Sequence, residues 1–402
     1  DYRILVTAPR RAQAERLLAH AGEHPRLAFW APDALLREGP PADLLLVDEA
    51  AAIPTPLLAA LLHRYPRIAF ATTVHGYEGT GRGFALRFRK ILDRETPGWR
   101  ERSLETPIRW GVDDPVERLI FRMLLLDAES VAGERLGDLR LADCRLERLD
   151  PARLADDEPI LRELFGLLVL AHYQTTPLDL RYLLDGPNVG GFLLRHREHV
   201  VGVVLSTREG GLDATLAQAI RDNRRRPRGH LLPQTIAAHL GRAEAVELTS
   251  ERVMRIAEHP ALWGRGLGRC LLTATLEDAA ARGIDMLGSS FGATVELLDF
   301  WASSGLHPVR LGFRRDAASG AHSALVLRGL SATGTQLVDE LRARFIQQLP
   351  ILLGDPLRDL EPALAARLLI REAAPDRQPS VADDRDLADF LAGRRGYEDT
   401  LV

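Results

Sequence analysis

The sequence predicts an α/β protein with two domains followed by a helical tail. Short apolar runs that alternate with helical patterns in the first part of the chain predict a parallel, doubly wound sheet. A hairpin, a strand, a glycine-rich loop and a helix in the second part predict a further α/β unit with a binding turn. The 402 residues can bury two or three hydrophobic cores, so a single domain is not expected.

The composition is that of an ordinary globular protein. Apolar residues make up 46% and charged residues 27% of the chain, and the net charge is −4 at pH 7. No global basic field marks a nucleic-acid binder, so any RNA site must be a local patch. Two cysteines, Cys144 and Cys270, provide neither a disulfide framework nor a metal cluster, and we expect a cytoplasmic protein. No apolar run has membrane-spanning length, so no membrane partner is expected.

Three apolar runs near the start of the chain are predicted strands. They span residues 3–7, 44–47 and 67–73, and residues 10–21 have the pattern of a helix. The second run ends in Asp48-Glu49, which is the form of a Walker B strand. Asp48 would then hold a nucleotide-bound magnesium ion and Glu49 would orient a water. A strand end followed by solvated acids is the alternative.

The nucleotide-binding interpretation lacks one essential part. A P-loop requires Gly-x-x-x-x-Gly-Lys-Ser/Thr, and the only lysine, Lys90, has no such glycines before it. We therefore expect the P-loop to lie upstream of Asp1 in a longer polypeptide, and a vestigial ATPase is the alternative. The loop 72–83 contains four glycines and is either a γ-phosphate sensor or a mobile surface loop.

A strand-rich block lies between two mostly helical regions. Residues 116–186 have helical periodicity, with breaks at Pro159 and Pro177. The block that follows is predicted to contain a hairpin at 192–195 and 200–207, strand 251–258, helix 269–282, strand 284–289, helix 295–304 and strands 309–313 and 323–327. After Gly334 the pattern is helical again, apart from a polar connection at 373–386.

The most informative segment is the loop between strand 251–258 and helix 269–282. Gly264, Gly266 and Gly268 remove side chains where the helix begins, so backbone N–H groups and the positive end of the helix dipole face outward. This arrangement cradles a phosphate or pyrophosphate. A dinucleotide-binding turn requires a different glycine spacing after the first strand of a βαβ unit. A flexible helix start is the remaining alternative.

The order of these elements resembles the GNAT acetyltransferase fold, whose loop pattern is Gln/Arg-x-x-Gly-x-Gly/Ala. The pattern falls on Trp263–Gly268, with Trp263 at the usual Gln/Arg position. The resemblance implies an acetyl-CoA site made of Ile256, Ala257, Glu258, Trp263, Gly264, Arg265, Gly266, Leu267, Gly268, Arg269 and Glu296.

The chain as a whole resembles the bacterial tRNA(Met) cytidine acetyltransferases, truncated on the amino-terminal side. The segments that carry this resemblance are 48–54, 72–84, 171–180, 229–234, the glycine loop and 290–301. It implies a partial RecD-like, P-loop NTPase-like helicase module at 1–115, a GNAT domain with a helical lead-in at 116–330, and a helical RNA-binding tail at 331–402. It also implies acetyl-CoA-dependent N4-acetylation of the wobble cytidine of elongator tRNA(Met), coupled in the full-length enzyme to ATP or GTP hydrolysis. Arg109 is the expected nucleotide-contacting arginine.

The expected chemistry is direct attack of an amine on a thioester. This reaction requires no enzyme nucleophile, only a proton acceptor and N–H groups that polarise the carbonyl. The candidate proton acceptors are Glu258, His259, His230 and Glu296. Residues 221–228 carry five arginines, and the candidate RNA contacts among them are Arg224, Arg225, Arg226 and Arg228. A solvated loop is the alternative for this charge run.

Two other functions remain open at this point. One is a GNAT enzyme that acetylates protein or small-molecule amines, with the first block as a scaffold. The other is a non-catalytic RNA-binding fragment whose GNAT fold only holds CoA. The expected partners are tRNA(Met) and acetyl-CoA, and a monomer is expected.

Overall fold

The chain forms two compact units whose segments interleave in the sequence. The computed structural model describes residues 2–22, 24–73, 81–171, 175–316, 319–370 and 381–400. The first unit comprises residues 1–131, 155–185 and 317–320, and the second comprises 132–154, 186–316 and 321–402. Parts of the predicted γ-phosphate loop (74–80) and of segment 171–180 (172–174) lie outside the described residues. The domain boundaries expected after residues 115 and 330 stay predictions.

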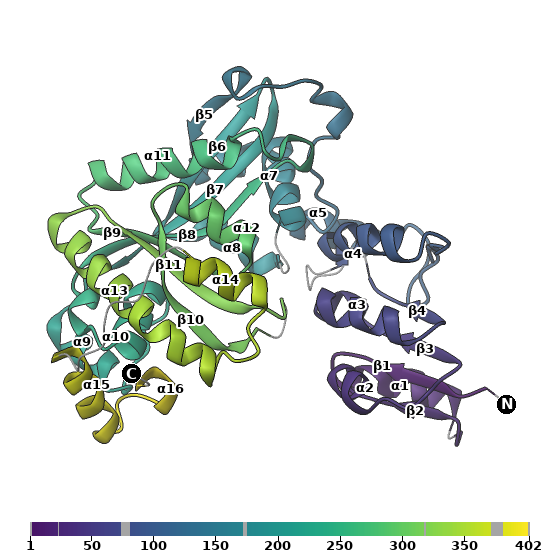
Figure 1. Ribbon diagram of the computed structural model, residues 1–402. Helices are drawn as coiled ribbons and strands as arrows, with labels where there is room; N and C mark the ends of the chain where they lie inside the picture. The colour runs from purple at the N-terminus through teal and green to yellow at the C-terminus, as the bar shows by residue number, and fades with distance from the viewer. Residues whose placement is uncertain are drawn as a thin grey trace. The chain divides into compact units, whose positions relative to one another are not determined.

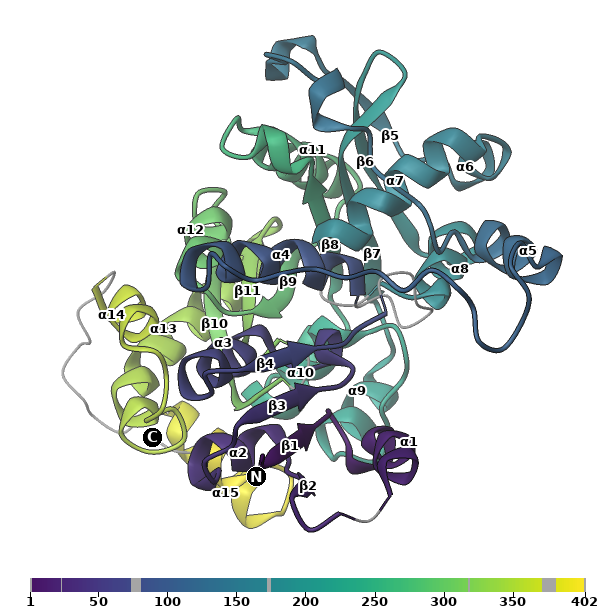
Figure 2. The same ribbon diagram turned by 90° about the vertical axis from the view of Figure 1, so that its right-hand side faces the viewer.

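The first unit is built on a four-stranded parallel sheet in the order β2-β1-β3-β4 (Figure 2). Its strands are β1 (Ile4–Thr7), β2 (Leu27–Phe29), β3 (Leu44–Val47) and β4 (Ile68–Phe70). They are followed in turn by α1 (Arg11–Ala21), α2 (Pro32–Glu38), α3 (Thr55–Arg64) and α4 (Gly81–Glu95). The predicted parallel sheet is confirmed, and β2 is a short strand that the sequence pattern did not reveal.

Helices cover both faces of this sheet, as a parallel sheet requires. Leu5 and Val47 pack in one core cluster with residues of α2 and α3, whereas Val6 packs with Ala14 of α1 on the other face. The chain leaves β1 toward β2 and leaves β3 toward β4, so the two connections diverge. The carboxyl ends of β1 and β3 therefore form the topological switch point, where doubly wound sheets bind ligands.

Three helices complete the first unit: α5 (Pro115–Leu124), α7 (Glu158–Ala171) and α8 (Pro177–Asp185). Pro159 and Pro177 lie in the first turn of α7 and α8, where proline is tolerated, so they begin helices rather than break one. Residues 116–186 were predicted to be mostly helical, and the strand β5 (Arg145–Arg148) of the second unit is the exception. The short helix α6 (Pro151–Asp156) also belongs to the second unit, apart from its last two residues, which fall in the first.

The second unit is built on a seven-stranded sheet in the order β10-β11-β9-β8-β7-β6-β5. Every neighbouring pair is antiparallel except β8 and β9. The strands after β5 are β6 (Val189–His196), β7 (His199–Gly210), β8 (Thr249–Glu258), β9 (Met286–Gly292), β10 (His307–Arg315) and β11 (His322–Gly329). Each strand predicted between residues 192 and 327 overlaps one of these.

Helices also cover both faces of this larger sheet (Figure 1). On one face lie α11 (Leu267–Ala281) and α12 (Val295–Ala302), and on the other lie α10 (Leu231–Leu240) and α13 (Ala332–Gly354). Leu271 of α11 lies next to Gly202 of β7, and Trp301 of α12 stacks on Phe291 of β9 at 5.7 Å between ring centroids. Met286 of β9 packs in the core cluster shared by α10 and α13.

The carboxy-terminal helix α15 (Val381–Leu391) is held to the rest of this unit by buried ion pairs. The other helices of the tail are α14 (Pro362–Ile370) and α16 (Tyr397–Thr400), and α9 (Ala214–Arg221) lies earlier in the chain, between β7 and α10. Asp389 of α15 pairs with Arg221 of α9 at 2.7 Å, and Asp386 pairs with Arg344 of α13 at 2.9 Å. The prediction of an irregular connection through residue 386 was wrong, because α15 begins at Val381. Among the described residues, no helix is both long and apolar enough to cross a membrane.

Candidate functional site

The central strands β8 and β9 separate part-way along their length. Their parallel pairing runs from Ser250 with Met286 to Val253 with Ser289 and continues no further in the described chain. Beyond this point β8 is paired only with β7, and β9 only with β11. A register shift between β7 and β8 marks a bulge at the same place, which re-aims the end of β8. The result is a fork with two open strand edges.

A side-chain hydrogen bond joins β8 and β9 at the point where the two strands diverge, which we call the crotch of the fork. The Ser289 hydroxyl donates a hydrogen bond to the Val253 carbonyl at 3.0 Å. The edge of β8 that faces the fork then runs through Ile256 and Ala257 to Glu258, three of the residues expected to contact the donor substrate. An extended ligand that carries amide groups can hydrogen-bond to such an edge in the manner of an added strand.

The glycine loop connects the end of β8 to α11. Gly264 has φ 78° and Gly266 has φ 86°, in the left-handed region that side chains with a Cβ avoid. A Cβ built on either residue would meet no atom within 4 Å, so the space in front of the loop is open. Gly266 is the N-cap of α11. The first N–H groups of the helix and its positive dipole end therefore face a space that can hold an anion.

Gly268 is a glycine for a different reason. A Cβ there would lie 3.1 Å from the Phe300 ring of α12, so α11 and α12 pack closely at this point. The Gly268 N–H donates to Oε2 of Glu258 at 3.0 Å. Burial raises the pKa of the Glu258 carboxyl, and this hydrogen bond offsets part of that increase. The Glu258 carboxylate thus accepts a hydrogen bond from the Gly268 N–H, which is one of the N–H groups that an anionic ligand would use.

Trp263 supports the loop in place of the usual Gln or Arg. Its indole N–H donates to the Glu258 carbonyl at 3.3 Å, which ties the loop back to the end of β8. Arg265 is also engaged, because its Nη1 donates to the Leu139 carbonyl at 2.7 Å. Arg269 is exposed on the first turn of α11. Glu296 is exposed on the first turn of α12, which follows the open end of β9.

The candidate proton acceptors are already engaged in structural hydrogen bonds. Nδ1 of His259 accepts the Ala261 N–H at 3.2 Å and caps a short turn, and the residue is only 6% exposed. Nδ1 of His230 accepts the Gly210 N–H at 3.0 Å, which places the proton of the neutral ring on Nε2. His259 and His230 therefore use Nδ1 in structural hydrogen bonds, whereas the Glu258 carboxylate accepts from Gly268 through Oε2 and keeps Oε1 as an acceptor.

The arginine run follows α9 and borders a hollow of about 360 Å³ beside α10. Arg226, His230 and Arg252 are among the residues that line it. Arg224 is paired with Asp222 at 2.8 Å. Other members of the run are less constrained: Arg225 and Arg228 are exposed, and their side chains form no hydrogen bond or ion pair with another described residue.

Asp48 and Glu49 lie at the switch point of the sheet in the first unit. The Asp48 N–H donates to the Thr7 carbonyl at 2.8 Å, and Oδ1 of Asp48 accepts the Glu49 N–H at 3.0 Å. The hydroxyl oxygens of Thr7 and Thr72 are buried there without a hydrogen-bond partner among the described residues. A carboxylate beside unpaired hydroxyls fits the edge of a magnesium–nucleotide site. The described residues contain no cluster that would bind a metal without the nucleotide.

Arg109 is not placed with these acids. It is exposed in the irregular segment between α4 and α5, and among the described residues its side chain makes no contact with Asp48 or Glu49. The sequence pattern did not reveal the hydroxyls of Thr7 and Thr72. Their position at the carboxyl ends of predicted parallel strands is the signal that would have found them.

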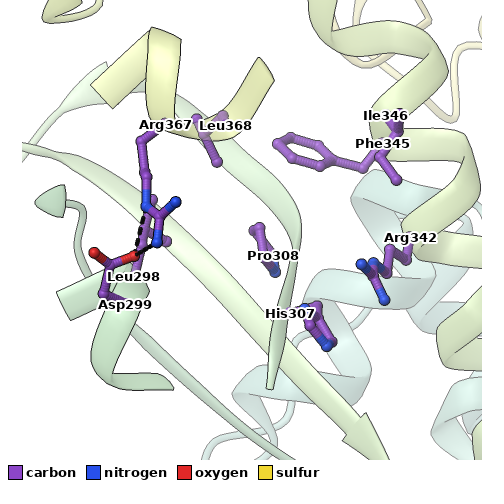
Figure 3. A pocket seen from close by; sticks show the side chains of 9 residues that line it. All are labelled: Leu298, Asp299, His307, Pro308, Arg342, Phe345, Ile346, Arg367 and Leu368. Atoms are coloured by element: carbon purple, nitrogen blue, oxygen red, sulfur yellow. Dashed lines mark hydrogen bonds and ion pairs between the residues drawn. The ribbon is translucent and has the colours of Figure 1, made fainter. Parts of the chain in front are cut away.

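A small apolar hollow lies where α12, β10, α13 and α14 meet (Figure 3). Leu298, Phe345 and Leu368 line it, and the ion pair between Arg367 and Asp299 lies at its rim. Its volume is about 40 Å³. Ligand pockets usually have roughly 300 to 1,000 Å³, so this hollow is too small to bind a substrate.

Comparisons with known families match both parts of the chain. The family described as RNA cytidine acetyltransferase NAT10/TcmA, helicase domain, matches residues 1–127, and GNAT acetyltransferase 2 matches 163–274 and 269–331. The chain is 52% identical to tRNA(Met) cytidine acetyltransferase TmcA of Nitrosococcus halophilus, over 98% of this chain and 55% of that protein. It is 41% identical to TmcA of Haloferax volcanii, over 91% and 51% respectively. The chain thus spans about half the length of these curated relatives.

Solved acetyltransferase structures show a distant likeness. The ribosomal-protein-S18-alanine N-acetyltransferase of Escherichia coli has a TM-score of 0.32 and 12% identity, with 47% of this chain and 94% of that chain covered. The IAA acetyltransferase of Bacillus cereus has a TM-score of 0.30 and 16% identity, with 46% and 99% covered. This likeness is too distant to add a functional argument.

Proposed function

Because this chain belongs to the RNA cytidine acetyltransferase family of NAT10/TcmA, we propose that it acetylates N4 of the wobble cytidine in elongator tRNA(Met) with acetyl-CoA as donor. The observation that carries the proposal is the β8–β9 fork that leads into the glycine loop. In this fork the open edge of β8 is followed, after the glycine loop, by the N-terminus of α11. An amide-containing arm that ends in a pyrophosphate requires these two features in this order.

The donor end of the site is formed by backbone rather than by side chains. Acetyl-CoA supplies an acetyl group that is already activated as a thioester. The edge of β8 at Ile256 and Ala257 pairs with its pantetheine amides, and the N–H groups from Gly264 to Gly268 bind its pyrophosphate. Trp263 fixes the loop relative to the strand. Since the two parts are held together, the thioester is placed at the crotch of the fork.

The chemical step depends mainly on orientation. The N4 amine of cytosine is a weak nucleophile because its lone pair is delocalised into the ring, so holding it against the thioester supplies much of the rate. Backbone N–H groups at the fork polarise the carbonyl as it becomes an oxyanion. Since His259 and His230 use Nδ1 elsewhere and Oε2 of Glu258 is bonded to Gly268, we assign proton removal to water at the open end of the fork, where Glu296 is the nearest exposed carboxylate along the chain.

The first unit supplies a nucleotide-dependent motor in the complete enzyme. Asp48 and Glu49 form its magnesium-facing edge, together with the hydroxyls of Thr7 and Thr72, which are unpaired among the described residues. The thioester requires no further activation, so hydrolysis of ATP or GTP remodels the RNA. We place the reaction in the cytoplasm, where tRNA and acetyl-CoA meet, and expect the chain to act as a monomer.

The proposed activity is tested by following labelled acetyl groups. The chain is incubated with labelled acetyl-CoA and a short oligonucleotide that carries the tRNA(Met) anticodon loop, a substrate that requires no remodelling. We expect label in the RNA and N4-acetylcytidine after nuclease digestion and mass spectrometry. A parallel incubation with total protein provides the contrast. Label in protein but not in RNA would support an acetyltransferase that acts on protein amines. Label in neither would support the non-catalytic alternative, in which the GNAT fold only holds CoA.

RNA binding is expected to depend on the less constrained arginines of the 221–228 run. A variant with both Arg225→Ala and Arg228→Ala loses two exposed guanidinium groups that have no partner in the described part of the chain. The slope of log affinity against log salt concentration should then become shallower by about 1 to 2, because each phosphate contact contributes roughly 0.7 to 0.9. Filter binding of tRNA over a salt series measures this slope.

The control for this variant is Arg153→Ala. The Arg153 side chain is 89% exposed and pairs with nearby Asp150, so it tests loss of charge far from the run. The control should leave the slope unchanged. An equal change in both variants would show a general charge effect, and an unchanged slope in the double variant would remove these arginines from the interface.

A further inference from the structure

The hollow beside α10 lies on the face of the larger sheet opposite α11. Its volume of about 360 Å³ falls within the usual range of ligand pockets, roughly 300 to 1,000 Å³. Its polar lining residues are Arg226, His230, Gln234, Thr235, His239 and Arg252. No acidic side chain is among the described residues that line it. The hollow is therefore large enough for a ligand, and its lining favours an anionic one.

Arg252 of β8 is the anchored cation of this hollow. Its Nε donates to Oε1 of Glu209 at 2.6 Å, and Glu209 is only 1% exposed. Oε2 of Glu209 accepts the Leu232 N–H at the start of α10, at 2.8 Å. The Nη atoms of Arg252 form no hydrogen bond or ion pair with another described residue. The buried carboxylate thus fixes the orientation of the guanidinium group and leaves its outer N–H groups for a ligand.

Two further donors line the same space. Nδ1 of His230 accepts the Gly210 N–H, so the neutral ring carries its proton on Nε2 and donates from there. Arg226 is an exposed member of the arginine run. The Gln234 side-chain amide donates to the Pro227 carbonyl, which holds this run against α10. Donors from β8, from the arginine run and from the start of α10 therefore border one hollow.

The hollow is connected to the fork through Arg252. This residue directly precedes Val253, whose pairing with Ser289 is the last between β8 and β9 in the described chain. The helix α11, whose N-terminus faces the donor, covers the other face of the sheet. Direct transfer requires donor and acceptor at the crotch together. A ligand in the hollow and acetyl-CoA at the glycine loop can be bound at the same time, because they occupy opposite faces.

We propose that the hollow binds a backbone phosphodiester of the RNA beside the target cytidine, with Arg252 and Arg226 as its cationic partners and His230 as a third donor. This rests on the proposed function, which makes RNA the acceptor. A phosphodiester carries a negative charge on its non-bridging oxygens, and a fixed guanidinium group matches their geometry. Phosphate contacts set the register of a bound nucleic acid. This contact therefore positions the cytidine N4 relative to the crotch.

The test adds a negative charge to the hollow without breaking an ion pair. Thr235 lines the hollow from α10, so Thr235→Glu places a carboxylate there and Thr235→Gln places a neutral side chain of the same size. Filter binding with the intact chain measures Kd for the anticodon-loop oligonucleotide. We expect Thr235→Glu to bind about tenfold more weakly than Thr235→Gln, because a like charge then faces the phosphate.

The control for added charge is Thr333→Glu. Thr333 is exposed on the first turn of α13 and does not line the hollow. This variant should bind the oligonucleotide within about twofold of the wild-type chain, because water and salt screen a distant exposed charge. An equal loss of affinity in Thr333→Glu and Thr235→Glu would show a general charge effect and would overturn the site.

Neutral linkages in the RNA identify the phosphate. Methylphosphonates replace the phosphodiesters of the oligonucleotide one at a time. We expect one linkage beside the target cytidine at which neutralisation weakens binding to the wild-type chain about tenfold. At that linkage Thr235→Glu and Thr235→Gln should bind equally well, since no charge is left to repel. The same small effect at every linkage would show that the hollow holds no particular phosphate.

A second variant keeps the test independent of folding. Arg252→Lys keeps a cation beside the buried Glu209 but lacks the planar fork that holds a phosphate through paired contacts. We expect its RNA affinity to fall about fivefold, while the midpoint of urea denaturation stays unchanged. Wild-type RNA affinity in Arg252→Lys would remove Arg252 from the interface.

The remaining outcomes separate this site from the proposed function. Equal RNA affinity of Thr235→Glu and Thr235→Gln, with acetylation of the RNA intact, would overturn the phosphate site and leave the proposed function standing. Weaker binding of acetyl-CoA to Thr235→Glu in calorimetry, with RNA affinity unchanged, would assign the hollow to the donor instead. Failure of the wild-type chain to bind the oligonucleotide would overturn the proposed function and this site with it.

Discussion

A Gly266→Asp variant should bind acetyl-CoA about 100-fold more weakly than the wild-type chain, a difference of about 2.8 kcal/mol. Two causes contribute. Gly266 has φ 86°, which disfavours a residue with a Cβ, and the new carboxylate stands at the helix N-terminus that receives the pyrophosphate. No described atom lies within 4 Å of the new Cβ, so the variant should still fold. Isothermal titration calorimetry with acetyl-CoA measures the change.

The opposite end of α11 provides the matched control. Gly283 also has a positive φ, 70°, and a Cβ at this position would likewise stand in open space. Gly283→Asp therefore introduces the same residue and a similar backbone strain away from the loop. We expect its affinity for acetyl-CoA to stay within about twofold, since strain alone does not act on the ligand. A Gly266→Asp variant that binds as well as this control would contradict the anion cradle.

Asp389→Ala should be the most damaging single change in the carboxy-terminal region. Asp389 is 1% exposed and accepts two hydrogen bonds from Arg221, at 2.7 and 2.8 Å, and one from Arg394 at 3.3 Å. Removing one partner of a buried ion pair leaves an uncompensated charge, which costs roughly 3 to 5 kcal/mol. We expect a loss near the lower limit, about 3 kcal/mol, because Arg221 can partly reach water. Urea denaturation of the intact chain measures it.

Hydrogen exchange separates global from local effects in the same variant. If α15 detaches while the sheet stays folded, amide protection is lost in α15 alone. Asp384→Ala is the control, since Asp384 lies on the same helix but is exposed. It should change stability by less than about 0.5 kcal/mol. Unchanged protection and an unchanged denaturation midpoint in Asp389→Ala would show that the ion pairs do not hold α15.

Local sequence patterns predicted those elements in which consecutive residues are all apolar and buried. The four-residue apolar run Leu44–Val47 became β3 without adjustment, because a strand covered on both faces is apolar throughout. The charged run Arg145–Arg148 became β5 at the edge of the larger sheet, where solvent accepts polar side chains and only β6 provides hydrogen bonds. The first half of the acidic helix α15, through Asp386, was missed because the arginines that neutralise this helix lie far away in the sequence.

The site divides in the same way. The glycine loop is contiguous, so its residues could be named from the sequence, and the structure places them at one helix start. The fork depends on where β8 stops pairing with β9, which is a property of register between strands that are not adjacent in sequence. Nδ1 of His230 is bonded to an N–H 20 residues away, so no sequence pattern could indicate how that ring is engaged.

The hydrogen bond between Glu258 and Gly268 couples ligand binding at the glycine loop to the protonation of Glu258. A carboxylate that must yield its N–H partner to an incoming pyrophosphate loses the contact that lowers its pKa, while burial continues to raise it. The negative ligand raises that pKa further. If acetyl-CoA fills the site as proposed, we therefore expect proton uptake on binding and, by reciprocity, tighter binding as the pH falls through the pKa of Glu258.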